Sequence, residues 1–334
     1  MNDFTIILLL KDRHEFNERF FEYYQKYGSE YNLIISDGSK KKIDKKILKI
    51  INSSKKIKYI KYVEDLDYKR YYKKILSTLK IVKTKLVLFA ANDDFIIYKN
   101  IPKLLNFLSN NDRYVGAGGT VIGFKLKRIN GKKCLTEIHT IYKKKNYLEN
   151  INHQKRVLYL LSNYSNIPLM SIMKTKILIN SYRYSSGMFN NNIELKDHFT
   201  ALFNLSQGRI KMYREPIIFH EDQINSEGNK RSQVLIKSLS DKNYIDDVFL
   251  LDKILSKKLN LKRFKIFKIY LEQFFKTYLN ATELKTEPSM NKIIDLVLKK
   301  TKRRLKLNKL ISNKNINSDI LKIKKELEFF LNKI

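Results

Sequence analysis

Residues 86–94 read LVLFAANDD, in which six apolar residues, Leu86–Ala91, run directly into Asn92-Asp93-Asp94. An apolar run of this length, closed by polar turn residues, predicts a strand that is buried on both faces, as in a parallel sheet. Adjacent carboxylates at a strand end repel each other unless a cation or hydrogen-bond donors compensate the charge. The stretch therefore indicates a site for a divalent cation; the alternative is a helix N-cap or a turn formed by Asp94.

Strands and helices alternate on both sides of this stretch. Apolar runs predict strands over residues 4–10, 31–36 and 57–62, and helical periodicity predicts helices over 15–27, 43–51, 68–82 and 101–108. This alternation predicts an α/β protein whose mostly parallel sheet is flanked by helices. Farther along, we expect a hairpin of strands over 114–125 and 135–142, helices over 149–161 and 193–205, and a last strand pair over 209–213 and 216–219.

After residue 226 the predicted strands stop, and helical segments rich in Lys and Arg follow. We therefore divide the chain into an α/β domain, residues 1–226, and a basic C-terminal helical region, residues 227–334. The 334 residues include 67 Lys and Arg against 33 Asp and Glu, which gives a formal net charge of +34. Such a charge attracts nucleic acid, anionic membranes and phosphorylated small molecules. Because the cations are spread along the whole chain, the charge selects none of these partners.

Cysteine usage and hydropathy indicate the compartment. A single cysteine, Cys134, excludes an intramolecular disulfide framework and a cysteine zinc cluster, and it fits a reducing compartment. The apolar run over residues 4–10 is too short for a secretory signal and follows Asp3 instead of a basic segment. No run approaches the roughly 20 apolar residues that a membrane-spanning helix needs. We expect a cytoplasmic protein.

Three polar segments directly follow predicted strands: Lys11-Asp12-Arg13, Asp37-Gly38-Ser39 and Asn92-Asp93-Asp94. Parallel strands present their carboxyl ends at one edge of the sheet, and ligands bind there, near the place where the strand order reverses. We therefore expect the three segments to converge on one site. In that site Asp37 could accept hydrogen bonds from a base or a ribose; the alternative is a plain turn.

Two later segments carry further candidates. Glu194 lies three residues before Asp197 and four before His198 on a predicted helix, so that the three share a face. A carboxylate on that face could act as a general base. His220 follows an apolar strand and could supply a nitrogen ligand to a divalent ion. A solvated helix face and a surface histidine are the respective alternatives.

Several common motifs are excluded. The glycines of Gly116-Ala117-Gly118-Gly119 do not form a dinucleotide-binding pattern, because Val121 stands where the third glycine is required and no ribose-binding acid follows at the expected distance. We interpret them as places where a backbone passes close to a ligand or another strand. The sequence contains no GxxxxGKS/T phosphate loop, no HExxH and no GxSxG motif.

The order and spacing of eight short segments carry a family resemblance. They are Thr5-Ile6-Ile7, residues 34–39, residues 74–88, Asn92-Asp93-Asp94-Phe95, residues 115–119, residues 194–199, residues 208–211 and Arg214-Glu215. Together they resemble the family-2-like glycosyltransferases of the GT-A fold, especially bacterial members with an Asp-Asp-Asp-Phe motif. The resemblance covers roughly residues 4–222. It implies a GT-A-type, Rossmann-like sheet and a metal-dependent, hexosyltransferase-like enzyme.

The resemblance also assigns roles to single residues. It implies that Asp37 contacts the base or ribose, and that Asp94, with Asp93 beside it, binds Mn²⁺ or Mg²⁺. It implies that Asp197 or Glu194 is the catalytic base and that His220 is a further metal ligand. Two positions depart from the family pattern: Asn92 stands where Asp is usual, and Leu10-Lys11-Asp12-Arg13 replaces the commoner Pro-Thr-Tyr-Asn.

The implied reaction moves a sugar from a nucleotide-diphosphate donor to a glycan or a lipid-linked acceptor, with inversion, in bacterial surface polysaccharide synthesis. The metal on Asp94 would neutralise the diphosphate, and Asp197 or Glu194 would take the proton of the acceptor hydroxyl. The further contacts expected for the nucleotide sugar come from Asp12, Arg13, Arg70, Lys74 and Asp93.

The basic C-terminal region suits an anionic membrane surface, because segments such as residues 261–279 mix aromatic residues with Lys in an amphipathic pattern. This predicts peripheral attachment to the inner face of the plasma membrane; an ordinary helical subdomain is the alternative. Three other functions remain open. A sugar-phosphate nucleotidyltransferase would need a glycine-rich loop after the first strand, a nucleic-acid-binding protein would need a compact basic patch, and Asn92 suggests an inactive relative.

Overall fold

The computed structural model describes residues 3–142, 146–162, 167–189, 192–222, 242–270, 272 and 314–333. The described strands form one nine-stranded sheet in the order β3-β2-β1-β4-β8-β6-β9-β5, with β7 paired to β6. They are β1 (Phe4–Leu10), β2 (Asn32–Asp37), β3 (Ile57–Lys61), β4 (Leu86–Ala90), β5 (Asp94–Ile96), β6 (Tyr114–Ile129), β7 (Lys132–Tyr142), β8 (Ile172–Lys174) and β9 (Arg209–Glu221).

The N-terminal part of the sheet is parallel, because β1 pairs with β2 and β4, and β2 pairs with β3. The remainder is mixed: β6 and β9 are parallel to each other, whereas β5, β7 and β8 run antiparallel to their neighbours. The predicted α/β class, with a mostly parallel sheet flanked by helices and helices at the C-terminus, is confirmed.

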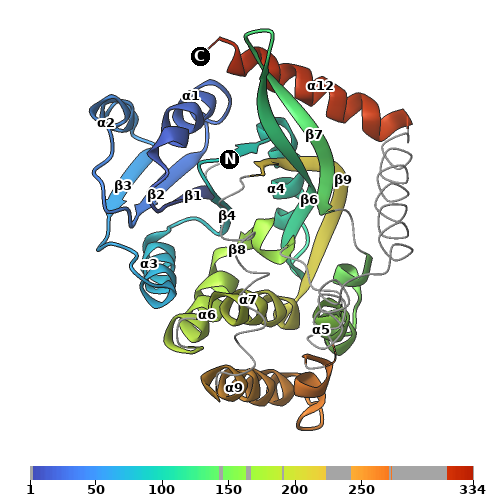
Figure 1. Cartoon of the computed structure of the whole chain (residues 1–334). Helices are drawn as coiled ribbons and strands as arrows, with labels where there is room; N and C mark the ends of the chain where they lie inside the picture. The colour runs from blue at the N-terminus through green and yellow to red at the C-terminus, as the bar shows by residue number, and fades with distance from the viewer. Residues whose placement is uncertain are drawn as a thin grey trace, which may run out of the picture.

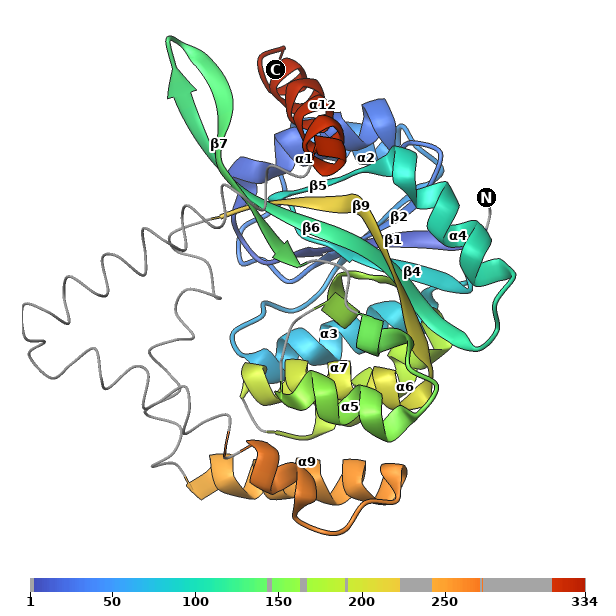
Figure 2. The same cartoon turned by 90° about the vertical axis from the view of Figure 1, so that its right-hand side faces the viewer.

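Helices cover both faces of the sheet (Figures 1 and 2). Alternating residues of β1 show the division, because Ile6 and Leu8 belong to one buried cluster and Ile7 belongs to the other. The first cluster includes side chains from α1 (Asn17–Tyr27), α2 (Lys45–Asn52), α4 (Ile101–Ser109) and α12 (Lys314–Leu331). The second includes side chains from α3 (Tyr68–Ile81), α5 (His153–Ser162), α6 (Thr175–Gly187), α7 (Ile193–Gln207) and α9 (Lys242–Leu259).

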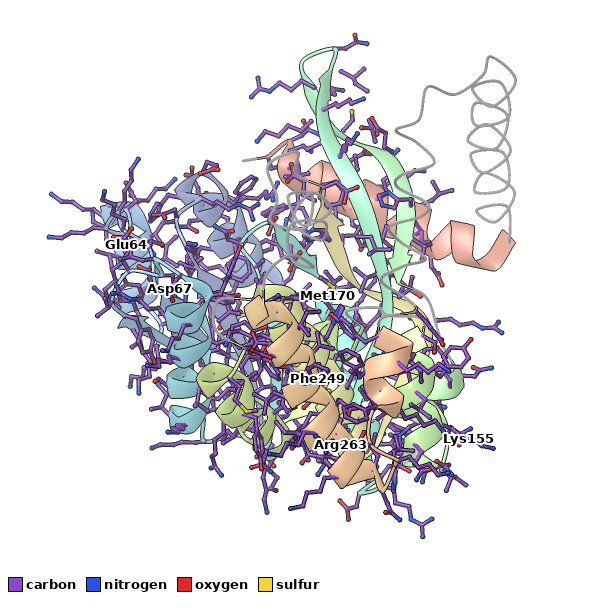
Figure 3. All side chains as sticks on the ribbon, turned by 60° about the horizontal axis from the view of Figure 1, so that its bottom comes forward. Glu64, Asp67, Lys155, Met170, Phe249 and Arg263 are labelled. Carbon is purple, nitrogen blue, oxygen red and sulfur yellow. The ribbon has the colours of Figure 1, made fainter. Side chains whose placement is uncertain are left out.

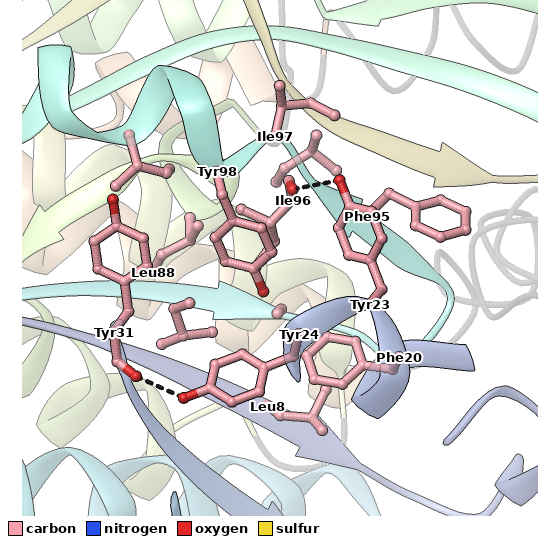
Figure 4. Packing of buried hydrophobic residues seen from close by; sticks show 14 of the residues in the cluster. Leu8, Phe20, Tyr23, Tyr24, Tyr31, Leu88, Phe95, Ile96, Ile97 and Tyr98 are labelled. Carbon is pink, nitrogen blue, oxygen red and sulfur yellow. Dashed lines mark hydrogen bonds between the residues drawn. The ribbon is translucent and has the colours of Figure 1, made fainter. Parts of the chain in front are cut away.

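Aromatic side chains fill the layer between α1 and the sheet (Figure 4). The hydroxyl of Tyr23 donates to the carbonyl of Ile96 at 3.1 Å. Phe330 of α12 meets Tyr23 and Phe95 edge to face, with ring centroids 5.2 and 6.4 Å apart. Since Phe95 directly follows Asp94, this packing fixes the short strand that carries Asp94.

Four elements differ from those expected. The short strands β5 and β8 and the helix α6 were not predicted from the sequence. The two strands expected over 209–213 and 216–219 are one strand, β9, in which Pro216 lies opposite Thr120. Proline lacks the N–H of a ladder bond, and register shifts on either side of Thr120 accommodate it, while the Thr120 hydroxyl donates to the carbonyl of Arg214 at 2.7 Å.

The glycine cluster of β6 lies where strands and chain segments approach closely. A Cβ at Gly116 would collide with Met173, one at Gly118 with Ser171, and one at Gly119 with the backbone of Glu215. These glycines therefore admit protein neighbours. The division expected at residue 226 lies outside the described residues. Among the helices that the structure describes, none is long and apolar enough to cross a membrane.

Candidate active site

The strand order reverses between β1 and β4, because β2 and β3 lie on one side of β1 and β4 on the other. Open α/β sheets bind ligands beyond the carboxyl ends of the strands at such a reversal. Here Arg13 follows β1 and Asp93 follows β4. Nη2 of Arg13 donates to Oδ2 of Asp93 at 2.6 Å. The structure thus brings the segments after β1 and β4 together.

A cluster of three potential metal ligands lies at this reversal. Strand β5 pairs with β9 in a register that places Asp94 directly opposite His220. Nδ1 of His220 lies 2.7 Å from Oδ1 of Asp94. One ligand atom each from Asp93, Asp94 and His220 can be chosen so that all lie within 4.8 Å of one another. Two carboxylates and one imidazole form a ligand set that suits a divalent ion such as Mn²⁺.

The charge balance of the cluster fits a cation. Asp93 and Asp94 are 1% and 7% exposed, and Oδ1 of Asp93 is buried without a hydrogen-bond partner in the described structure. Burial and the charge of Asp94 raise the pKa of Asp93. Burial lowers the pKa of His220, but its hydrogen bond to Asp94 and the nearby acids outweigh burial and raise the pKa to about 9. A bound cation would replace the His220 proton and satisfy Asp93.

A buried ion pair supports the cluster from the α1 side. Nη1 of Arg19 donates to Oε2 of Glu221 at 2.5 Å, and Nη2 donates to the carbonyl of Asp93 at 3.3 Å. The Arg19 guanidinium also lies 4.9 Å from the ring centroid of Phe95. Arg19 therefore ties the chain after β4 to the end of β9, the two segments that supply the candidate ligands.

Asn92 stands where the glycosyltransferases that the sequence resembles carry an acid. Its side chain forms hydrogen bonds with the loop after β1. Its side-chain amide donates to the carbonyl of Arg13 at 2.8 Å and to Oδ1 of Asn17 at 2.9 Å. Asp12 and Arg13 both have positive φ, 54° and 63°, which is uncommon for residues other than glycine. Asn92 thus holds a loop in an unfavourable conformation with Arg13 against Asp93.

Asp37 ends β2 and is fully buried. Its Oδ1 accepts from the backbone N–H of Ser39 at 2.8 Å, and its Oδ2 accepts from Tyr59 at 2.7 Å and from Lys61 at 3.1 Å. Burial raises the pKa of Asp37, but these hydrogen bonds outweigh burial and hold it below its ordinary value. The backbone N–H of Asp12 donates to the hydroxyl of Ser39 at 2.7 Å, which joins the segments after β1 and β2.

The structure does not bring Arg70 and Lys74 to the metal-ligand cluster. Arg70 is exposed in the first turn of α3, where its N–H is capped by Asp67 at 2.7 Å. Lys74 is 3% exposed, forms an ion pair with Asp65 and donates to the carbonyl of Leu10 at 2.9 Å. In this position Lys74 stabilises the end of β1 through the carbonyl of Leu10. For Lys74 to contact a phosphate, its ion pair with Asp65 would have to break.

A pocket of about 220 Å³ lies beside the metal-ligand cluster, and both Asp94 and Asp197 line it. Its other lining residues are mostly apolar or aromatic: Leu9, Tyr71, Tyr72, Ile75, Phe89, Ala90, Ala91, Leu169, Met170, Tyr182 and Ile218. A concave, largely apolar pocket with a few polar groups is typical of a small-molecule site. Two acids 103 positions apart in the sequence therefore share one cavity.

Tyr72 holds the carboxylate of Asp197. Its hydroxyl donates to Oδ1 of Asp197, and its ring packs against Tyr182 with centroids 5.4 Å apart. Burial first, and then the charge of Asp197, raise the pKa of Tyr72 well above its ordinary value, so that the hydroxyl keeps its proton. Tyr72 was not predicted as a site residue from the sequence. Its only signal is the polar end of an aromatic residue on the inner face of a predicted helix.

The first turn of α7 positions the other residues of this segment. The side chain of Asn192 caps the helix by accepting from the N–H of Leu195 at 3.0 Å. Glu194 belongs to this turn, and its side chain lies outside the described part of the structure. Nδ1 of His198 lies 2.9 Å from the hydroxyl of Tyr270. Among the side chains of α7 that the structure describes, Asp197 is the acid that lines the pocket.

Comparisons with known proteins give similarity in fold alone. No protein-family model matches the chain, and no curated protein matches it. Among solved structures, one of S. aureus TarS is 14% identical, covers 79% of this chain and 44% of its own, and has a TM-score of 0.46. TarS residues 1–349 are 13% identical over 83% of this chain and 81% of that one, also with a TM-score of 0.46. Those residues in complex with UDP-GlcNAc are 13% identical over 78% and 72%, with a TM-score of 0.46. The match spans less than half of the first of these chains.

Proposed function

We propose that this protein is a metal-dependent glycosyltransferase that uses a nucleotide-diphosphate sugar. The observation that carries the proposal is the shared pocket, in which Asp94 of the metal-ligand cluster and the helix-borne acid Asp197 both take part. A reaction that releases a diphosphate and deprotonates an acceptor hydroxyl can use a cation and a base that face one cavity. The position of the cluster at the reversal of strand order favours a nucleotide ligand.

Asp93, Asp94 and His220 would hold the cation, which would neutralise the charge of the leaving diphosphate. Arg13 lies against Asp93 with its side chain 38% exposed, so its guanidinium can turn to a phosphate oxygen when the cation takes over Asp93. Asp197, oriented by Tyr72, accepts the proton of the acceptor hydroxyl as it attacks the anomeric carbon. One candidate base, Asp197, among the described residues of the pocket supports a direct displacement with inversion.

The acceptor and the setting are finer parts of the same proposal. We assign the acceptor to a glycan or a lipid-linked glycan in bacterial surface polysaccharide synthesis, with the protein in the cytoplasm at the inner face of the plasma membrane. The apolar lining of the pocket and the cationic helices support this assignment. Of the tail segment over 261–279, only residues 261–270 and 272 lie within the described part of the structure.

The cation and nucleotide can be tested together by thermal shift. Nucleoside diphosphates should raise the melting temperature of the protein in the presence of Mn²⁺ and not in its absence, because the diphosphate binds through the cation. Asp94→Asn should abolish the shift. Asp112→Asn is the matched control, because the side chain of Asp112 is fully exposed. Equal shifts with and without Mn²⁺, or in Asp94→Asn, would contradict the proposed cation site.

Turnover tests the base. Asp197→Asn should lower sugar transfer by about 10² to 10⁴, the typical contribution of a general base, while the Mn²⁺-dependent nucleotide shift remains. A panel of nucleotide sugars, with release of the nucleoside diphosphate as the readout, identifies the donor. Full transfer activity in Asp197→Asn would remove Asp197 from the mechanism and leave the nucleotide site standing.

A further inference from the structure

The turn that follows α9 holds an exposed phenylalanine in a strained conformation. Phe264 has a φ of 66°, a region that bulky residues rarely adopt, and 45% of the residue is exposed. Asp252, itself 2% exposed, fixes this conformation. Its carboxylate accepts from the backbone N–H groups of Phe264, Ile266 and Phe267 at 3.0, 3.0 and 3.1 Å. Strain that the surrounding structure maintains is typical of functional positions.

Phe264 belongs to a small aromatic cluster at the surface. Phe249 of α9 is 39% exposed and stacks on Phe267 with centroids 4.2 Å apart and planes at 8°. Phe264 meets Phe249 edge to face at 5.9 Å. The guanidinium of Arg263 lies 4.7 Å from the ring centroid of Phe264. Phe267 thus covers a face of Phe249, and Arg263 covers a face of Phe264. A nucleobase that stacked on these faces would have to displace them.

Exposed cations lie in the same segment of the chain as these rings. Figure 3 views the molecule from the side of α9, with Phe249 and Arg263 labelled. The described residues 244–272 contain seven exposed basic side chains: Lys253, Lys257, Lys258, Lys262, Arg263, Lys265 and Lys268. They contain two exposed acids, Asp246 and Glu272. Lys253 lies four residues after Phe249 on α9, so these two side chains share a helix face.

The aromatic cluster is built onto the helix that carries Asp197. The helical residues after Phe264 reach α7 through Tyr270, whose hydroxyl lies 2.9 Å from Nδ1 of His198. Lys258 of α9 lies 4.7 Å from the ring centroid of Phe203 of α7. These contacts hold the aromatic cluster in a fixed position relative to α7, the helix that carries Asp197.

We propose that Phe249, Phe264 and these cations, apart from Lys258, form a docking patch for an anionic lipid bilayer. Phenylalanine has no polar group, and its transfer into the interface between headgroups and acyl chains is favourable. The cations of the same segment match a surface of lipid phosphates, each contributing about fivefold in affinity, or about 1 kcal/mol. The strained turn keeps Phe264 in position for insertion. The patch gives the proposed membrane setting a defined surface and rests on that part of the proposed function; it does not depend on the proposed reaction.

The test measures binding of the full chain to vesicles by co-sedimentation. Binding is expected to vesicles that contain phosphatidylglycerol and not to pure phosphatidylcholine. Phe264→Gly is the decisive variant, because glycine adopts positive φ without strain. Vesicle binding should fall about tenfold with the loss of one inserted ring, while the melting temperature stays equal or rises. Arg263→Gln should weaken binding about fivefold.

The tip of the β6–β7 hairpin supplies a matched control. Arg128 and Ile129, an exposed cation and an exposed apolar residue, end β6, and the β6–β7 hairpin reaches the end of the molecule away from α9 (Figure 1). Arg128→Gln and Ile129→Ser should leave vesicle binding unchanged. Asp94→Asn should also bind vesicles normally. Vesicle binding therefore tests the patch independently of whether the proposed enzyme activity is correct. Unchanged binding in Phe264→Gly combined with Phe249→Ser would overturn the patch. Displacement of the protein from vesicles by a single-stranded oligonucleotide, with the same variants impaired, would reassign it to nucleic acid.

Discussion

Asn92→Asp separates the family pattern from the structure. The substitution restores the acid that glycosyltransferases of the resembling family carry at this position. If residue 92 faced the metal, the variant would bind the cation more tightly. The structure predicts the opposite, because the amide nitrogen of Asn92 donates two hydrogen bonds into the loop of Arg13 and Asn17, and an aspartate has no such donors.

The expected cost follows from these two bonds and from burial. Asn92 is 4% exposed. Asn92→Ala removes the donors to the Arg13 carbonyl and to Asn17, which we expect to cost about 2 kcal/mol of unfolding free energy. Asn92→Asp adds a buried carboxylate next to Asp93, and unpaired buried charges cost about 3 to 5 kcal/mol. Asn17 can turn its amide to donate to the new carboxylate, so we expect a total loss near the lower end, about 3 kcal/mol.

Denaturant unfolding of the wild type, Asn92→Asp and Asn92→Ala at neutral pH measures these differences, and calorimetric titration with Mn²⁺ measures the cation affinity. Lowering the pH toward 4 should bring Asn92→Asp closer to Asn92→Ala, since a protonated carboxyl regains one donor. Stability of Asn92→Asp within about 0.5 kcal/mol of the wild type would refute the structural role of Asn92. Binding of Mn²⁺ about tenfold more tightly by the variant would also refute it, since residue 92 would then belong to the metal site.

Three further perturbations follow from the structure. Tyr72→Phe keeps the buried ring but removes the hydrogen bond to Asp197. The rate of sugar transfer should fall about tenfold, while nucleotide binding in the thermal-shift assay stays unchanged. An unchanged rate of sugar transfer would refute a positioning role for Tyr72. Burial lowers the pKa of Lys196 from 10.5 to about 8, so between pH 8 and 10.5 the unfolded chain binds more protons than the folded chain. The unfolding free energy of the wild type should therefore rise with pH relative to that of Lys196→Met. Parallel pH profiles of the two proteins would contradict this. Arg19→Met leaves Glu221 buried without its partner, and chemical denaturation should show a loss of about 3 to 5 kcal/mol, whereas a loss below 1 kcal/mol would show that the pair is dispensable.

The sequence alone determined the architecture of the N-terminal half and the place of its acids. Apolar runs such as Leu86–Ala91 and helical periodicity such as that of residues 68–82 are local signals, and β4 and α3 lie where these signals predict them. The polar residues after the strands then had to meet at one edge, because parallel strands end on the same side of a sheet. The same local signals failed at β5, β8 and β9, which are short or interrupted by Pro216 and depend on their partners in the sheet.

Tertiary structure alone decided what each acid and base touches. His220 meets Asp94 through a strand register that joins positions 126 residues apart, and Asp197 meets Tyr72 across 125 residues of sequence. In the sequence Lys74 could pair with a phosphate or with an acid, and only the folded structure, which buries it beside Asp65, assigns it to Asp65. Composition and periodicity report which face of an element is apolar, but contacts between distant side chains depend on how the elements pack, which no local pattern encodes.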